Sequence, residues 1–114
     1  MDVPDRAVPA DAEFQKLVAE LAARLLEKGW RLATAESCTG GWIAKCCTDR
    51  AGSSGWFERG FVTYSNAAKN ELLRVYPGSL ERDGAVSETV AAQMAEGARR
   101  GAGAQFAVAV TGIA

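Results

Sequence analysis

Hydroxyl side chains follow three apolar segments of the chain, and hydroxyls in such positions can bind or attack a ligand. They are Ser37 after the first segment, Tyr64 and Ser65 at the second, and Thr111 after the third. If the segments are parallel strands, their carboxyl ends meet at the edge of the sheet where α/β proteins bind ligands. The sequence therefore predicts a pocket at that edge, although hydroxyls are also common in ordinary turns.

Ser37 has the surroundings most typical of a reactive side chain. Gly40 and Gly41 follow it and allow the backbone to turn sharply and approach a ligand. N–H groups at the start of the next helix could hold an anion or a developing oxyanion. The turn is similar to a nucleophile elbow but lacks its G-x-S-x-G pattern. Local chemistry leaves three roles open for Ser37: nucleophile, holder of a phosphate, or helix cap.

The base that would activate a serine must be found without histidine, since the chain has none. This excludes Ser-His-Asp and Cys-His systems within the chain and leaves carboxylates, lysine, tyrosine or backbone groups. Lys69 is the candidate, because it lies in the first turn of a predicted helix, where the helix dipole disfavours its charge. Lys45 is expected to point into solvent, which is also the ordinary place for any lysine.

Cys38 is a competing nucleophile, but it is expected to point away from the face that Ser37 uses. The three cysteines, Cys38, Cys46 and Cys47, have neither disulfide nor zinc spacing. We expect them to be reduced and semi-buried.

Two other features favour structural roles. Glu36 is expected to pair with Arg31 or another cation. The aromatic pair Trp56-Phe57 could stack on a flat ring, but packing in the core or in a dimer is favoured.

The elements that must position these residues alternate between helix and strand. Apolar residues at helical spacing predict a first helix, capped by Asp11 and ended by Gly29; they are Phe14, Leu17, Val18, Leu21, Ala22, Leu25 and Leu26. The next segments are a strand at 32–36, a helix at 41–49, a loop at 51–55 and a strand at 61–64. They are followed by a helix from Ser65 or Asn66 to 73, a turn at Pro77-Gly78, a helix from the Ser87 cap to Gly101 and a strand at 106–110. Because this last strand is apolar throughout, we expect it to be covered on both faces. This order predicts an α/β layered domain with a largely parallel sheet.

Composition limits the class of protein. The 114 residues suit one domain, which we place at 11–114 behind a loose N-terminal arm at 1–10. The net charge of -1 favours neither a nucleic acid nor a membrane as partner. The chain has no apolar run long enough to span a membrane and no signal-peptide core at its start. We therefore expect a cytoplasmic protein.

Four stretches of the chain resemble the signature of the CinA C-terminal domain family. They are 34–41 (TAESCTGG), 51–66 (AGSSGWFERGFVTYSN) with Lys69, 84–88 (GAVSE) and 110–114 (VTGIA). The resemblance covers the chain from about residue 13 to its end, and its motifs are long and specific.

The resemblance implies a three-layer α/β/α domain that hydrolyses the carboxamide of nicotinamide mononucleotide to nicotinate mononucleotide and ammonia, in NAD recycling. It places the nucleophile at Ser37 and the base at Lys69, with Tyr64 and Thr111 orienting this pair and the substrate. Substrate-binding and oxyanion-stabilising groups fall on five residues: Thr39, Gly40, Gly41, Asn66 and Gly112. No metal or organic cofactor is implied, and family members usually form homo-oligomers.

The family pattern continues past 110–114 with a loop, a last strand and a helix, including groups that would bind the nucleotide phosphate. We therefore expect a domain that lacks this strand and helix, and a 114-residue chain with little or no activity of its own. Two alternatives remain. One is a non-catalytic nucleotide-binding or interaction module, related to competence or DNA damage; the other is an oligomeric scaffold.

Overall fold

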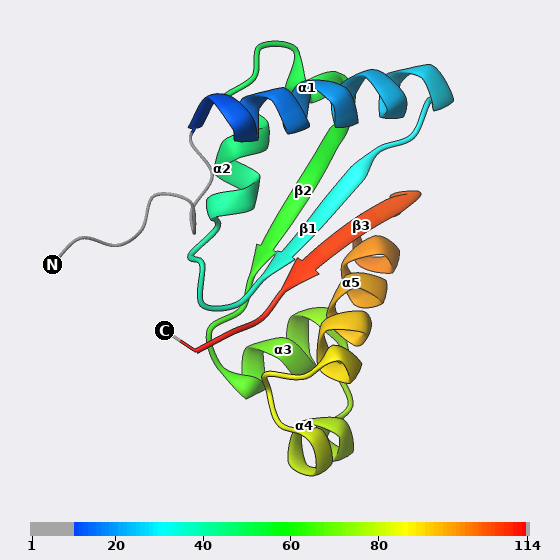
Figure 1. Cartoon of the computed structure of the whole chain (residues 1–114). Helices are drawn as coiled ribbons and strands as arrows, with labels where there is room; N and C mark the ends of the chain where they lie inside the picture. The colour runs from blue at the N-terminus through cyan, green and yellow to red at the C-terminus, as the bar shows by residue number, and fades with distance from the viewer. Residues whose placement is uncertain (1–10, 114) are drawn as a thin grey trace, which may run out of the picture.

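A computed structural model of the protein describes residues 11–113, which form three strands and five α-helices (Figure 1). The arm predicted at 1–10 lies outside the described residues. The elements are α1 (Asp11–Lys28), β1 (Leu32–Glu36), α2 (Trp42–Thr48), a short 3-10 helix η2 (Ser53–Gly55), β2 (Phe57–Val62), α3 (Asn66–Leu73), α4 (Pro77–Asp83), α5 (Glu88–Ala102) and β3 (Phe106–Val110).

β1 is the middle strand of a three-stranded parallel sheet with the order β2-β1-β3. All five residues of β1 are buried, as expected for a central strand with helices on both faces. Parallel neighbours require a crossover connection, which α2 supplies between β1 and β2, and α3 to α5 supply between β2 and β3. β2 and β3 are the two edges of the sheet within residues 11–113.

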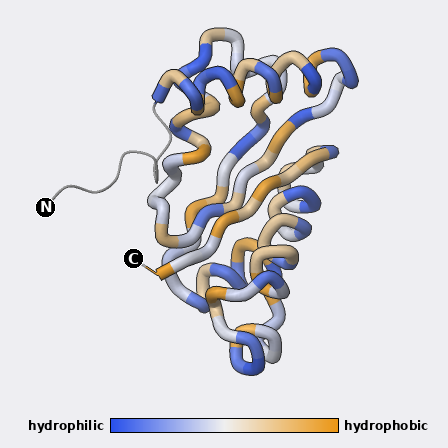
Figure 2. Tube along the Cα trace, in the orientation of Figure 1, coloured by the Kyte–Doolittle hydropathy of each residue, from blue (hydrophilic) through white to orange (hydrophobic). Residues whose placement is uncertain are grey.

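The side chains of β1 alternate between two cores, one on each face of the sheet. Ala33 and Ala35 belong to the core under α3 and α5, with Leu73, Val75, Val90, Met94, Ala98 and Ala104. Leu32 belongs to the core under α1 and α2, with Val18, Ala22, Leu25, Cys46, Cys47 and Trp56. Figure 1 shows these two helix groups on opposite sides of the sheet, and the hydrophobic segments in Figure 2 include β3. The predicted three-layer α/β/α architecture is confirmed.

Two predicted elements were wrong in extent or type. β2 spans Phe57–Val62 rather than 61–64, because its first residue already pairs with Leu32 of β1. Pro77-Gly78 does not form a turn but begins α4. Proline suits the first helical positions, where its missing N–H group has no partner to lose.

Smaller corrections concern helix ends and exposure. α1 includes Asp11 instead of following it, and α5 ends at Ala102, one residue before a left-handed Gly103. The apolar stripe of α1 is only partly used: Leu17 is 58% and Leu26 56% exposed, because the contact with the rest of the chain is narrower than the stripe.

β3 is less covered than its apolar sequence predicted. Phe106 is exposed and the other four residues are only half-buried. The reason is that β3 is an edge strand, with a neighbouring strand on one side only among the described residues.

Candidate active site

A row of three hydroxyl side chains follows the carboxyl ends of the strands. Because Glu36 is level with the last residues of β2 and β3, the next residues along the three strands, Thr63, Ser37 and Thr111, are level too. Two backbone hydrogen bonds extend the ladder to this row: Thr63 N donates to Glu36 O at 2.8 Å, and Ser37 N donates to Val110 O at 3.0 Å. The hydroxyls predicted at this edge therefore do gather there, with a threonine in place of the predicted tyrosine.

Ser37 is 5% exposed and begins the turn from β1 to α2. The alternation of β1 puts its side chain on the face of Ala33 and Ala35, toward α3 and α5. Cys38 follows with φ of 83°, a left-handed conformation that costs a non-glycine residue roughly 1–3 kcal/mol. Such strain is typical of turns that present a functional side chain.

The Glu36 carboxylate caps the N-terminus of α2. Its Oε1 accepts hydrogen bonds from Ile43 N at 2.7 Å and from Thr39 Oγ1 at 2.8 Å, and its Oε2 accepts one from Ala44 N at 3.0 Å. A negative charge at this end of a helix is stabilised by the N–H groups and by the helix dipole. Two N–H groups that a ligand could have used are therefore occupied by the protein itself.

The backbone N–H groups of Thr39, Gly40 and Gly41 make no hydrogen bond with any described residue. Gly40 and Gly41 have φ of 66° and 97°, the region that favours glycine, as their residue type predicted. These donors lie in the turn directly after Ser37. Their role toward an oxyanion stays a prediction.

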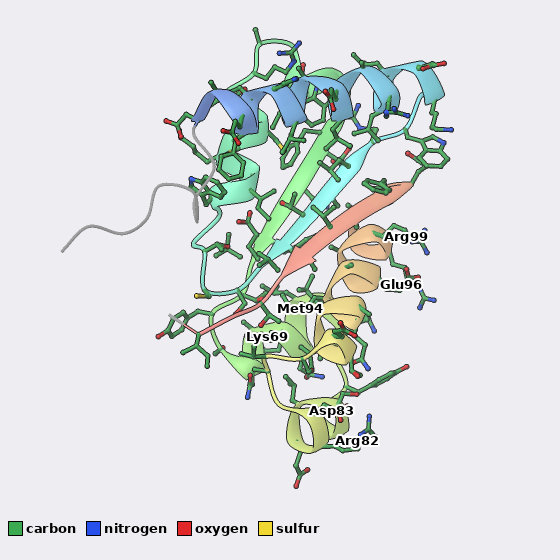
Figure 3. The ribbon with its side chains drawn as sticks, in the orientation of Figure 1. Lys69, Arg82, Asp83, Met94, Glu96 and Arg99 are labelled. Atoms are coloured by element: carbon green, nitrogen blue, oxygen red, sulfur yellow. The ribbon has the colours of Figure 1, made fainter. Side chains whose placement is uncertain are left out.

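Lys69 is a buried lysine, 2% exposed, on α3. Ser65 caps this helix by accepting a hydrogen bond from Ala68 N at 3.0 Å. The ammonium nitrogen Nζ donates to the carbonyl oxygen of Tyr64 at 3.5 Å. Burial lowers the pKa of Lys69, because the ammonium loses hydration. Figure 3 labels Lys69 on α3, near the carboxyl ends of the strands.

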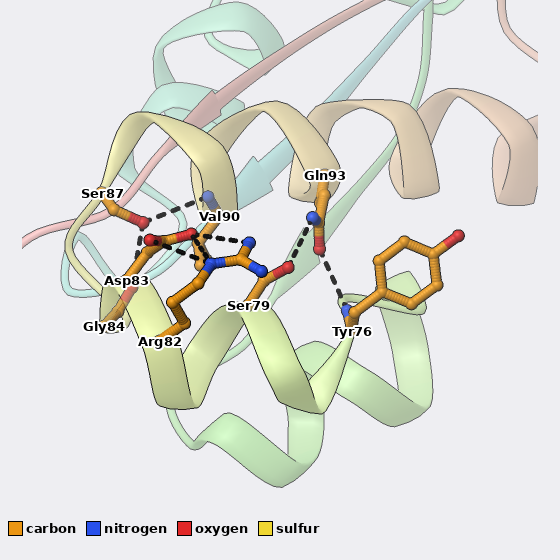
Figure 4. Close-up of polar contacts among 8 residues, drawn as sticks. All are labelled: Tyr76, Ser79, Arg82, Asp83, Gly84, Ser87, Val90 and Gln93. Carbon is orange, nitrogen blue, oxygen red and sulfur yellow. Dashed lines mark hydrogen bonds and ion pairs between the residues drawn. The ribbon is translucent and has the colours of Figure 1, made fainter.

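Thr111 ties the end of β3 to the loop before α5. Its hydroxyl donates to Ala85 O at 2.8 Å. Ser87 holds the same loop: its hydroxyl donates to Gly84 O at 2.9 Å and accepts from Val90 N at 3.2 Å, as the cap of α5 (Figure 4). In these contacts Thr111 anchors the sheet edge, and its action on a substrate stays a prediction.

The other predicted site residues differ in their distance from the row. Gly112 lies beside the Ser37 turn, since a Cβ placed on it would be 3.8 Å from Cys38 Sγ. Tyr64 is 85% exposed and Asn66 is also exposed. Among the described residues no hydrogen bond joins Ser37 to Lys69.

Thr63 is the residue that the sequence analysis missed. It is fully buried, and its hydroxyl has no hydrogen-bond partner in residues 11–113. The predicted strand at 61–64 placed Thr63 inside the strand, whereas β2 ends at Val62. The pairing of Glu36 with Val62 would have revealed it, since that register, set by a β-bulge after Leu32, brings Thr63 level with Ser37.

The cysteines and the aromatic pair do not enter the row of hydroxyls. All three cysteines are free, as predicted, but Cys38 is exposed rather than semi-buried. Burial raises the pKa of the Cys46 thiol and raises that of Cys47 to about 11, so both are poor nucleophiles at neutral pH. Trp56 is 1% exposed and packs in the core, as favoured above.

Three cavities lie away from the row. One of about 950 Å³ lies between α3 and α5, one of about 380 Å³ lies between α3 and α4 and is lined in part by Asn66, and an apolar one of about 180 Å³ lies between α1 and α2. None of these three is lined by Ser37 or Lys69. The described part of the chain contains no group of three or more His, Cys, Asp or Glu side chains that could hold a metal ion. None of its helices has the length and apolar character needed to cross a membrane.

Comparison with known proteins identifies one family. The model of the CinA C-terminal domain matches residues 14–114. Nicotinamide-nucleotide amidohydrolase PncC of Enterobacter agglomerans is 57% identical over 105 residues, which are 92% of this chain and 64% of the relative. The protein of that name from Escherichia coli K12 is 52% identical over 104 residues, 91% of this chain and 63% of the relative. The chain thus spans less than two thirds of either relative.

Solved structures give the same result. The competence/damage inducible protein of Agrobacterium tumefaciens superposes with a TM-score of 0.86 at 45% identity, covering 99% of this chain and 65% of that chain. A competence-damaged protein (CinA) superfamily protein of Escherichia coli also gives 0.86, at 40% identity, covering 98% of this chain and 67% of its own.

Proposed function

The chain belongs to the CinA C-terminal domain family, and from this premise we propose that its protein is an amidohydrolase that converts nicotinamide mononucleotide to nicotinate mononucleotide and ammonia. The observation that carries the proposal is that Lys69 and Ser37 are both buried at the same edge of the sheet, beyond the carboxyl ends of its strands. Burial lowers the pKa of Lys69 and so favours the neutral amine, the base that a chain without histidine needs.

In the proposed reaction Ser37 attacks the carboxamide. Its hydroxyl proton passes to neutral Lys69 while Oγ bonds to the amide carbon and the carbonyl oxygen becomes an oxyanion. The backbone N–H groups of Thr39, Gly40 and Gly41 stabilise that oxyanion. This assignment is supported by the fact that these three donors have no hydrogen-bond partner within the described residues.

Collapse of the tetrahedral intermediate breaks the C–N bond. The leaving nitrogen takes the proton from the Lys69 ammonium and departs as ammonia. Water then attacks the ester on Ser37 and gives up a proton to Lys69, which returns a proton to Ser37 as the carboxylic acid leaves. The net reaction consumes one amide and one water, and no metal or cofactor takes part.

The remaining residues bind or orient. The backbone carbonyl oxygen of Tyr64 accepts the hydrogen bond from Lys69, so the exposed phenol of Tyr64 is free to contact the substrate. Asn66 and Gly112 would contact the nucleotide, and Thr111 holds the edge through Ala85. Four further expectations stay predictions: association into homo-oligomers, a cytoplasmic location, a role in NAD recycling, and the lack of nucleic-acid or membrane partners.

The test is ammonia release from nicotinamide mononucleotide by the chain, by a version extended to the full length of its relatives, and by two variants of whichever is active. Ser37→Ala should lower kcat by at least about 10³, as loss of a covalent nucleophile does. Cys38→Ala, the matched control at the next residue, should keep most activity.

The opposite pattern, an inactive Cys38→Ala and an active Ser37→Ala, would assign the nucleophile to the cysteine. Binding of the nucleotide with no ammonia release by any version would favour the non-catalytic nucleotide-binding alternative.

A further inference from the structure

The hydroxyl of Thr63 is one of two buried side-chain polar atoms without a hydrogen-bond partner in residues 11–113; the other is the hydroxyl of Thr34. An unpaired buried hydroxyl costs about 1–3 kcal/mol, so each requires a physical explanation. The two threonines are alike in burial, both being 0% exposed. They differ in their surroundings.

Thr34 is explained by packing. It lies in the middle of β1, and its Oγ1 occupies the space over Gly60, where an added Cβ would be 2.6 Å away. The same space is bordered by Ala44 of α2 and by Phe57. Thr34 therefore sits in the layer between the sheet and α2, away from Ser37's face.

Thr63 lies on the other face and at the edge that bears Ser37. Phe61, two residues earlier, packs against the core under α5, so alternation puts Thr63 on that face as well. Its N–H donates to Glu36 O at 2.8 Å, which makes it the neighbour of Ser37 across the sheet. Lys69 comes from α3, which covers this face.

Lys69 is short of acceptors. An ammonium group carries three N–H donors, and its hydrogen bond within the described residues is to Tyr64 O, at the long distance of 3.5 Å. The neutral amine tolerates this, but the ammonium formed when it takes a proton does not. A buried ammonium group with one long hydrogen bond for its three donors and a buried hydroxyl without any partner thus share one face of the sheet edge.

We propose that Thr63 is a positioning residue of the Ser37–Lys69 pair, and that its hydroxyl accepts a hydrogen bond from the Lys69 ammonium formed when Ser37 gives up its proton. The proposal rests on the proposed function in taking Lys69 as the base. The bond forms with the charged state, so it stabilises the transition state more than the ground state. Thr63 makes no contact with the substrate or with Ser37 Oγ in this role and acts through Lys69 alone.

The test combines the titration of Lys69 with kinetics on the form of the protein that releases ammonia. The titration is followed by NMR on the chain with ¹³C-labelled lysine. Thr63→Val keeps the side-chain shape but loses the acceptor, so the pKa of Lys69 should fall further below its ordinary value. It should also lower kcat by about 10- to 100-fold at unchanged KM.

Thr63→Ser should restore both readouts, and Thr34→Val, the matched control, should change neither. Both valine variants should be at least as stable as the parent, since each removes an unpaired hydroxyl; Thr63→Ala replaces Thr63→Val if the latter does not fold.

An unchanged Lys69 titration in Thr63→Val, or an equal shift in Thr34→Val, overturns the inference. A shift seen in Thr63→Val but in neither Thr63→Ser nor Thr34→Val supports it even if no form releases ammonia, an outcome that would contradict the proposed function instead.

Discussion

Glu36 shows how the partner of a single residue determines its role. Its predicted pairing with Arg31 was wrong, because Arg31 precedes β1 and Glu36 is the last residue of that strand, roughly 16 Å away at the rise of a strand. Arg31 pairs with Glu58 at 3.1 Å. Glu36 instead accepts hydrogen bonds from the first turn of α2, and so fixes the turn that carries Ser37.

Lys69 should give the activity a dependence on pH. Because burial lowers its pKa, kcat/KM should fall about tenfold per pH unit below that pKa, where the ammonium cannot accept the Ser37 proton. Lys69→Met should lower kcat by at least about 10³ while still binding substrate. Ammonia release measured across a pH series tests both.

Lys45→Met is the matched control, since Lys45 is exposed and pairs with Asp49 at 2.7 Å. It should keep the parent rate and pH profile.

The lowered pKa of Lys69 also affects the free energy of unfolding. At pH values between this lowered pKa and the ordinary pKa of lysine, the unfolded chain binds more protons than the folded chain, so the free energy of unfolding rises with pH in that window. This rise should be absent from Lys69→Met. Parent-like rates in Lys69→Met would exclude the lysine base.

The element that carries Lys69 is held by a close contact between helices. α3 packs against α5 where a Cβ on Gly97 would overlap the carbonyl oxygen of Leu73. Leu73 lies one helical turn after Lys69 on the same helix. Because Gly97 has no side chain, α3 can lie close to α5, and this close approach determines how deeply Lys69 is buried.

Gly97→Ala should destabilise the chain despite the better helix propensity of alanine. The gain of about 1 kcal/mol from propensity is outweighed by overpacking against backbone that cannot yield, for a net loss of about 2 kcal/mol. Gly78→Ala in α4 is the control, because no atom lies within 4 Å of its added Cβ. Urea unfolding should show it unchanged or up to about 1 kcal/mol more stable. Equal stabilities of the two variants would refute this account of the contact.

At the scale of the whole molecule, the sheet has two unpaired edges within residues 11–113 and an apolar edge strand. In the β3 sequence FAVAV the first residue is exposed and the other four are only half-buried. Unpaired N–H and C=O groups beside apolar side chains form a template for association with another strand.

We therefore expect the 114-residue chain to self-associate, with a mass by light scattering that rises above one chain as concentration increases. Phe106→Lys places a charge on the exposed start of β3 and should reduce association. Leu72→Lys, at an exposed apolar position on α3, should not. A chain that stays monomeric throughout the concentration series would contradict the expectation.

The sequence by itself determined the order and type of most elements and the two residues on which the proposal depends. The helical spacing in 14–26 and the continuous apolar run 106–110 are local patterns, and the spacing of apolar residues is what separates helix from strand. Ser37 and Lys69 were found because glycines and a predicted helix start are also local signals. The absence of histidine restricted the base without any structure.

Only the tertiary structure decided which side chains share a site. The start of β2 at Phe57 and the row of Thr63 with Ser37 and Thr111 follow from strand register. The capping of α2 by Glu36 follows from the turn that returns the helix to the end of β1. Register joins residues distant along the chain, so no local pattern contains it. The burial that lowers the pKa of Lys69 is likewise a property of α3 against α5 and the sheet, and it exists only once these layers have packed.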